Sequence, residues 1–136
     1  MSSIIYDEKI KNTFYSAHIN SYQLVIDKKT GFFNASYVCI KNYRKINNWL
    51  NNKKTIKLIK YYMNLLNNKN NNNNKIKYKI VDKYDNINGI YLHPILLNHL
   101  LDWINIKINN KYNIIDYIIL VLNNIKLSIY KNNRNY

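Results

Sequence analysis

Two glycines and a single proline are the only residues of those types in this 136-residue chain, and they restrict where its backbone can turn sharply. Gly31 ends the segment Asp-Lys-Lys-Thr-Gly, which follows the strand-like residues 22–26 and can supply the positive φ that hairpin turns require. Gly89 ends a second turn-like segment, DKYDNING, just before the strand-like residues 90–92. Pro94 suits the first position of a helix. The sequence therefore predicts two hairpins and a helix that begins near the proline.

The first strand of the second hairpin has the clearest periodicity in the chain. Residues 75–81, KIKYKIV, alternate lysines with the apolar Ile76, Tyr78 and Ile80, which is the period of a half-buried strand. We expect the three apolar side chains to face a core and the lysines to face solvent. The tyrosine is expected to pack rather than to contact a ligand. This hairpin therefore presents a row of lysines on its outer face.

Between the two hairpins, the pattern predicts three helices. A short helix over residues 35–42 has Asn34 or Ser36 as its candidate N-cap, and a second short helix covers residues 45–50. A longer helix follows Asn51 or Asn52 and ends near residue 66. Ile56, Ile59, Met63 and Leu66 recur at helical spacing on its core-facing side, and Leu58, Tyr62 and Leu65 widen this apolar arc, so we expect the helix to be substantially buried. Its exposed strip is expected to be Lys53, Lys57, Lys60 and Asn64.

Two more helices are predicted after the proline. The first has an apolar stripe at helical spacing that comprises Leu96, Leu97, Leu100, Leu101 and Ile104. The second runs over residues 112–125, and its expected inward-facing side chains are Ile115, Ile118, Ile119 and Leu122. Together with the hairpins, these helices indicate an α+β fold.

Composition is typical of one globular domain. The hydrophobic fraction is 47%, and a chain of this length buries roughly two-thirds of its unfolded surface. We expect one domain over residues 21–126, with residues 1–20 as an N-terminal part of it and residues 127–136 as a frayed tail. Cys39 is the single cysteine, so an intramolecular disulfide is impossible and a reducing, intracellular compartment is expected.

Positive charge is concentrated in one part of the chain. The sequence has 21 basic and 7 acidic residues, a formal charge of +14. No Asp or Glu occurs over residues 28–81, which hold 13 of the basic residues. A/T-rich codons explain the abundance of Lys and Asn, but not this asymmetry. It indicates an anionic partner, either nucleic acid or a membrane surface. We expect no membrane binding, because the basic stretch is not one amphipathic helix with an apolar insertion face.

Two motifs carry a resemblance to a known family. The first comprises Phe33-Asn34-Ala35-Ser36, Val38-Cys39, Lys45-Ile46, Trp49-Leu50, Lys54-Thr55 and Leu58-Ile59. The second is GIYLHPILLNHLLDW, from Gly89 to Trp103. In this order they resemble the KilA-N domain of large DNA viruses and phages, over roughly residues 20–125. The turn before Lys45 lacks the glycines usual in that family.

The resemblance implies a DNA-binding module of a large DNA virus, poxvirus-like, with the fold of the fungal APSES transcription-factor domain. That fold is α+β, with a helix-turn-helix, a β-hairpin wing and C-terminal helices. We expect sequence-tolerant or A/T-favouring binding of double-stranded DNA, because lysine suits phosphate, asparagine suits adenine and arginine suits guanine. The expected nucleic-acid-binding residues are Lys41, Arg44, Lys45, Asn47, Asn48, Asn51, Lys53, Lys54, Lys57, Lys60, Lys75, Lys77, Lys79 and Lys83.

Other functions stay open as alternatives. The chain could serve as a viral interaction or virulence factor that binds a host or viral protein, or it could bind RNA or single-stranded DNA, where Tyr43 and Tyr84 would stack on bases. A homodimer is a further alternative. The resemblance places the protein in the host cytoplasm, in a viral factory, or in the nucleus.

We expect no enzymatic activity and no catalytic, cofactor-binding or metal site. Cys39 lies on an apolar helix face and is expected to be a core thiol. The three histidines have no metal-ligand spacing, and His93 is expected to cap or pack. The carboxylates are not clustered as a metal-dependent nuclease requires.

Overall fold

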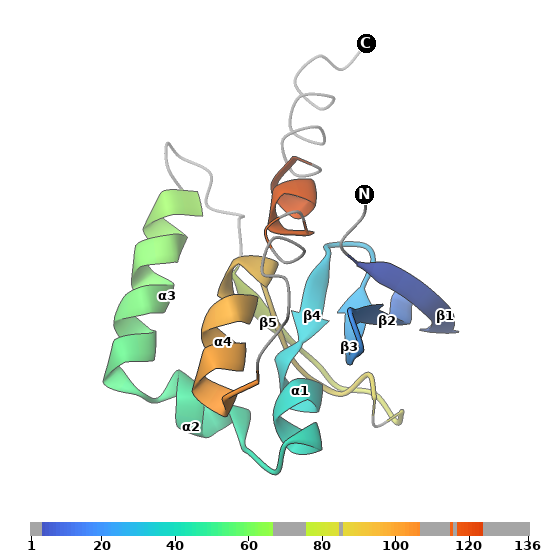
Figure 1. Ribbon diagram of the computed structural model, residues 1–136, viewed down its shortest axis with the longest axis horizontal. Helices are drawn as coiled ribbons and strands as arrows, with labels where there is room; N and C mark the ends of the chain where they lie inside the picture. The colour runs from blue at the N-terminus through green and yellow to red at the C-terminus, as the bar shows by residue number, and fades with distance from the viewer. Residues whose placement is uncertain (1–3, 67–75, 85, 107–114, 116, 124–136) are drawn as a thin grey trace.

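A computed structural model describes residues 4–66, 76–84, 86–106, 115 and 117–123. Within them, six antiparallel strands form one sheet in the order β1-β2-β3-β4-β6-β5, and helices pack on it (Figure 1). The elements are β1 (Ile5–Lys11), β2 (Phe14–Ile19), β3 (Tyr22–Asp27), β4 (Phe32–Asn34), α1 (Ala35–Lys41), α2 (Ile46–Leu50), α3 (Lys53–Leu66), β5 (Lys77–Ile80), β6 (Gly89–Leu92), the 3-10 helix η1 (Pro94–Leu96) and α4 (Leu97–Ile104). The mixed α+β fold, both hairpins and the helices over residues 35–66 are confirmed.

The core lies on both faces of the sheet. Neighbouring residues of one strand point to opposite faces, so Phe32 and Phe33 enter different clusters. The larger cluster holds Phe33 and Leu92 with buried side chains of the helices, including Trp49 of α2. The smaller one holds Phe32 and Tyr91. The sheet thus supports the helical layer on one side and a compact aromatic patch on the other.

The first two strands were not predicted from the sequence, which is ambiguous over residues 1–20. β1 pairs with β2, and β2 pairs with β3 in continuous register from Phe14 opposite Asp27 to Ile19 opposite Tyr22. The β1–β2 pairing shifts register twice, between Tyr6 and Glu8 and again further along the strand. Such irregularities break the simple alternation by which a strand is recognised in a sequence.

Both glycines are required by the backbone and by close packing. Gly31 has φ +82° in the β3–β4 turn, and a methyl group on it would collide with Val121 of the C-terminal helical segment. Gly89 has φ +142°, and its Cβ would lie 2.6 Å from Cβ of Ser36. The two hairpins are therefore fixed against elements that are distant in the sequence.

Helix α3 packs on the core with only part of the apolar arc predicted for it. Its buried residues are Thr55 and Ile59, and Leu58, Tyr62 and Leu66 are half-buried. Ile56 and Met63 were expected in the core, but they are 44% and 39% exposed. Apolar residues surround much of this helix, so the helical wheel left its orientation ambiguous.

The C-terminal helical segment, residues 115 and 117–123, matches the prediction in part, since Ile118 packs against the core and Leu122 is half-buried. Tyr117 and Val121 are buried, whereas Ile115 and Ile119 are 42% and 48% exposed. The Tyr117 hydroxyl donates a hydrogen bond to the carbonyl of Gly31. This contact fixes which face turns inward. The predicted tail over residues 127–136 lies outside the described residues.

Candidate nucleic-acid interface

Helix α1 is held at both of its ends by specific hydrogen bonds. Asn34 is the N-cap: its Oδ1 accepts from the backbone N–H of Tyr37 at 3.0 Å, and its Nδ2 donates to the carbonyls of Asn86 and Asn88, each at 2.9 Å. Ser36, the other N-cap candidate, instead accepts from the backbone N–H of Ile90. The start of α1 is therefore tied to the β5–β6 turn.

The turn after α1 closes with a Schellman motif. The N–H of Tyr43 donates to the carbonyl of Ile40 at 3.1 Å, and the N–H of Arg44 donates to that of Cys39 at 2.8 Å. Cζ of Arg44 lies 4.6 Å from the centroid of the Trp103 ring, a cation–π contact with α4. The turn between α1 and α2 is thus anchored by backbone bonds and by a side chain.

Helices α2 and α3 place the predicted contact residues on the surface. Asn51 is the C-cap of α2, and Oδ1 of Asn52 accepts from the N–H of Lys54 at 2.9 Å at the start of α3. Among the expected contacts, the exposed ones are Lys41, Arg44, Lys45, Asn47, Asn48, Asn51, Lys53, Lys54, Lys57, Lys60, Lys77, Lys79 and Lys83. Lys75 lies outside the described residues.

These basic side chains lack acidic partners within the part of the chain that the structure describes. Ion pairs there join Lys11 to Asp82 and His18 to Asp7, and neither involves an expected contact residue. Helices α1, α2 and α3 have no acidic residue in their first turn, and Lys53 and Lys54 occupy that of α3. Because a helix N-terminus is itself positive, this arrangement favours an anion at the start of α3.

The lysines divide into two groups in space. Lys53, Lys54, Lys57 and Lys60 lie on α3. A groove of about 710 Å³ lies between α1 and the β5–β6 hairpin, and both Lys41 and Lys79 line it. One lysine of the predicted wing and one lysine of α1 therefore lie beside the same groove. The hairpin is the edge of the six-stranded sheet, since β6 pairs with β4 and β5 is outermost.

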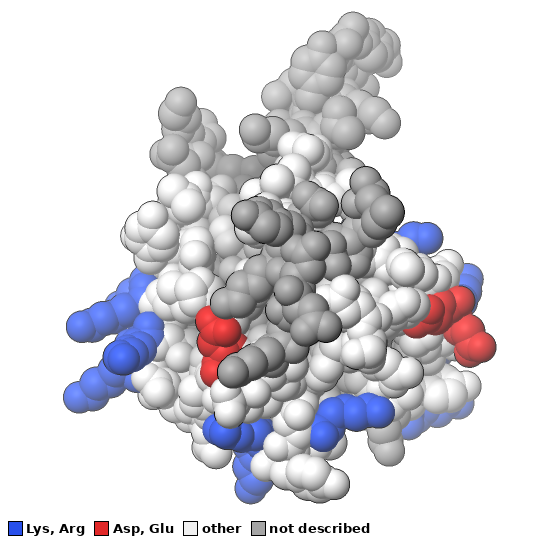
Figure 2. Space-filling model, viewed as in Figure 1, with Lys and Arg blue, Asp and Glu red and all other residues white. Residues whose placement is uncertain are grey.

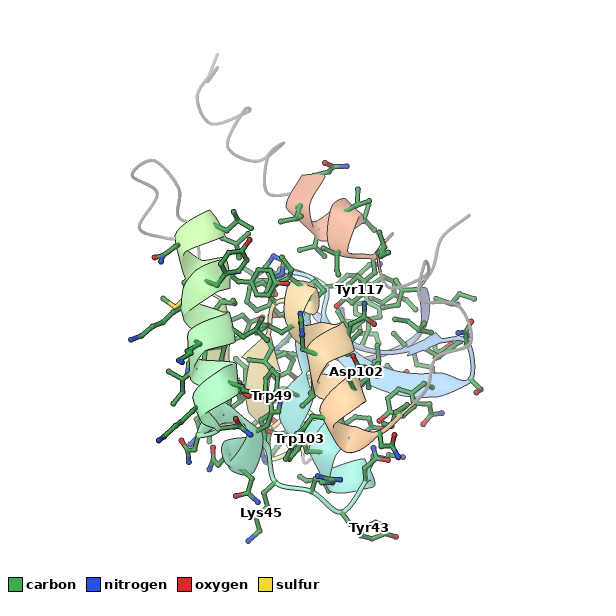
Figure 3. The ribbon with its side chains drawn as sticks, turned by 60° about the vertical axis from the view of Figure 1, so that its left-hand side comes forward. Tyr43, Lys45, Trp49, Asp102, Trp103 and Tyr117 are labelled. Atoms are coloured by element: carbon green, nitrogen blue, oxygen red, sulfur yellow. The ribbon has the colours of Figure 1, made fainter. Side chains whose placement is uncertain are left out.

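Basic side chains lie on several parts of the visible surface. Figure 2 shows lysine and arginine side chains along the side of the molecule occupied by α3, and also at the lower end, where Figure 1 places α1 and α2. One acidic group lies left of centre, near the α3 side, and another lies at the right, where Figure 1 places β1 and where further basic side chains are also visible (Figure 2). Asp102, labelled in Figure 3, is exposed on α4. The carboxylate of Asp102 therefore lies at the α4 side of the basic surface.

The three tyrosines considered for base contacts have different environments. Tyr78 packs, as expected: its hydroxyl donates to Oδ2 of buried Asp27 at 2.7 Å, and burial raises its pKa. Tyr84 has Nζ of Lys11 at 5.2 Å from its ring centroid. Tyr43 is 99% exposed at φ 59°. The sequence alone does not reveal that backbone conformation.

The buried thiol and imidazole are parts of the fold. Cys39 is fully buried in α1, and burial raises its pKa to about 11, so it is a core thiol as expected. His93 caps η1 through Nδ1, which accepts from the N–H of Ile95 at 3.0 Å, and burial lowers its pKa to about 4. Both groups are neutral at pH 7. Across the described helices, none is both long and apolar enough to cross a bilayer.

Comparison with known proteins gives the family. Residues 17–120 match the KilA-N domain. The chain is 32% identical over 121 residues to KilA-N domain-containing protein 006L of Invertebrate iridescent virus 6, covering 82% of this chain and 33% of that protein. It is 30% identical over 118 residues to protein 313L of the same virus, covering 83% and 33%, and 32% identical over 106 residues to protein R878 of Acanthamoeba polyphaga mimivirus, covering 74% and 29%.

The fold and these matches together define an α+β module of the KilA-N type. The chain belongs to the KilA-N domain family, which is associated with DNA binding and is generally non-catalytic. The relatives named here come from an iridescent virus and a mimivirus, and do not single out the poxviruses. The chain spans about a third of the length of these relatives. No solved structure matches it.

Proposed function

We propose that this chain, encoded by a large DNA virus, binds double-stranded DNA through α2 and α3. The observation that carries the proposal is the exposed lysine surface of α3, which begins with Lys53 and Lys54 at the positive end of the helix and has no ion-pair partner among the described residues. Cations and a helix N-terminus directed at the same surface favour phosphate. The strip continues along the helix through Lys57 and Lys60.

The helices and the hairpin take the roles of a helix-turn-helix and a wing, in an arrangement like that of the APSES domain. α1, its closing turn and α2 supply the helix-turn-helix, and Asn47 and Asn48 of α2 and its C-cap Asn51 are exposed. Asparagine pairs with adenine in the major groove, which suits A/T-favouring binding. Lys77 and Lys79 of β5 extend the phosphate contacts from the edge of the sheet.

A charge-reversal pair tests the proposal against its matched control. The variant Lys57→Glu/Lys60→Glu lowers the formal charge from +14 to +10, because each change removes two units. The control Lys9→Glu/Lys29→Glu makes the same change at exposed positions on β1 and in the β3–β4 turn. We expect the α3 pair to abolish duplex binding and the control to retain most of it. Equal losses in both variants would overturn the assignment to α3.

A second candidate function is the binding of a protein in the groove beside α1. Ile40 and Val81 line that groove and are 70% and 83% exposed. Exposed apolar side chains beside lysines suit a partner with apolar and acidic residues. The variant Ile40→Asp/Val81→Asp tests this function in a pull-down on nuclease-treated samples. It should no longer capture a protein partner, whereas duplex binding by α3 should remain.

A further inference from the structure

Tyr43 has a backbone conformation that a tyrosine rarely adopts. It occupies the left-handed position of the Schellman motif after α1, with φ 59°, where glycine is usual. The other non-glycine residues with positive φ in the described part of the chain are Asn12, Asn20 and Asn105. Asparagine tolerates this region, whereas a bulky side chain there is an outlier. Tyr43 is therefore a strained position that the fold itself would fill better with glycine or asparagine.

The side chain of Tyr43 does not offset this strain by packing on the described part of the chain. Tyr43 is 99% exposed, and the aromatic and cation–π contacts among the described residues include neither its ring nor its hydroxyl. The neighbouring cations have other rings: Nζ of Lys41 lies over Tyr37, and Arg44 lies over Trp103. A strained backbone that supports an unpacked ring points to a role outside the fold.

The backbone that carries the Tyr43 side chain is held in place, and the residues around it are cationic. Backbone bonds of the Schellman motif and the Arg44–Trp103 contact hold the turn on both sides of Tyr43. Figure 3 shows Tyr43 and Lys45 projecting from the lower end of the molecule. Lys41, Arg44 and Lys45 are all exposed beside it. A rigidly presented aromatic ring among cations matches the chemistry of a nucleobase and its adjoining phosphates.

We propose that Tyr43 stacks on a nucleobase of the bound DNA, at a step where the duplex is locally unstacked. Lys41 and Lys45 would contact the phosphates on either side of that base, and these contacts would keep the ring against it. This inference rests on the proposed duplex binding and adds to it a preference for deformable sites. Base steps that unstack readily, or a base already extruded from the helix, offer the face that the ring needs.

The test compares Tyr43→Gly and Tyr43→Asn with Tyr43→Phe in the full chain. Each variant is titrated against a regular duplex and against the same duplex with a single 2-aminopurine bulge. Loss of one base–aromatic stack corresponds to about a 5- to 150-fold loss of affinity for the bulged duplex. We expect that loss for Gly and Asn but not for Phe. The melting temperature of Tyr43→Gly should equal or exceed that of the wild type, because glycine relieves the backbone.

The control variant Asn105→Gly makes the same backbone change at another exposed left-handed position, and should bind as the wild type does. Quenching of 2-aminopurine by the wild type and Tyr43→Phe, but not by Tyr43→Gly, reports stacking directly. Unchanged affinity and quenching in Tyr43→Gly, with normal duplex binding by the wild type, would overturn this inference alone. A wild type that binds neither duplex would overturn the proposed function together with it.

Discussion

The guanidinium of Arg44 lies over the indole of Trp103, with 4.6 Å between Cζ and the ring centroid. The contact joins the α1–α2 turn to the C-terminal half of α4, two segments 59 positions apart in the sequence. Arg44 is also exposed, and the N–H groups of a guanidinium suit an anion or a guanine. Arg44, one of the expected contact residues, therefore both fixes the turn and remains available to DNA.

The strength of this contact is measurable by a double-mutant cycle. Arg44→Met retains an unbranched apolar stem but loses the cation, and Trp103→Leu retains apolar bulk but loses the ring. We expect the unfolding free energies to show a coupling of about 0.5–1 kcal/mol, the usual value for an exposed cation–π pair. Additive effects of the two substitutions would mean that the turn is held by its backbone hydrogen bonds alone.

A substitution at the start of α3 is predicted to raise the stability of the protein and to lower its affinity for DNA. Lys54→Glu replaces a cation by an anion at the positive end of the helix, so unfolding should require about 0.3–1 kcal/mol more free energy at low salt. Duplex affinity should fall by more than in the neutral variant Lys54→Gln. Chemical denaturation and anisotropy measure the two effects on the same samples. A variant that is more stable and still binds normally would remove Lys54 from the interface.

Replacement of the buried Asn34 by aspartate is predicted to destabilise the protein. Asn34→Asp keeps the oxygen that caps α1 but loses the donors to the carbonyls of Asn86 and Asn88. It also places a carboxyl group where the side chain is fully buried. We expect a loss of about 3 kcal/mol in unfolding free energy, against a near-neutral effect for Asn48→Asp on the surface. Similar melting temperatures for the two variants would contradict the assigned hydrogen bonds.

His93 is predicted to make the protein less stable in mild acid. Burial lowers its pKa to about 4, from an ordinary value of about 6.5, so the unfolded chain binds the proton first. Stability from the neutral ring is complete above pH 6.5 and decreases as the pH falls toward 4, by about 3 kcal/mol in total. His93→Asn retains an acceptor for the N–H of Ile95 and does not titrate. The wild type should lose more stability than this variant over that range.

Local patterns were sufficient for much of the fold. The alternation of lysine with Tyr78 and Ile80 predicts the face of β5, because a strand at the edge of a sheet with one covered face has a period of two. Ile76 was expected on the same face, but it precedes the strand and packs in the larger cluster instead. The leucine stripe after Pro94 likewise predicts α4, whose buried residues include Leu97, Leu100, Leu101 and Ile104. In both elements, one face is unambiguously polar or apolar.

Tertiary contacts decided the rest. Isoleucine, leucine and tyrosine occur around much of α3, so only packing against neighbours distinguishes buried Ile59 from exposed Ile56. β1 was missed because its pairing with β2 is irregular. For the interface, composition predicts exposed lysines, but not that Lys41 and Lys79 share one groove or that Tyr43 adopts a left-handed backbone. Those relationships depend on how the chain turns between elements.

The most direct test of duplex binding by the lysine surface is fluorescence anisotropy with a labelled duplex of about 20 base pairs, titrated from about 50 to 200 mM salt. An interface with roughly four to eight phosphate contacts predicts a slope of log affinity against log salt of about −4 to −7. The α3 variant Lys57→Glu/Lys60→Glu should bind too weakly to measure. A wild type that binds with a flat slope, or no more tightly than the α3 variant, would contradict the account.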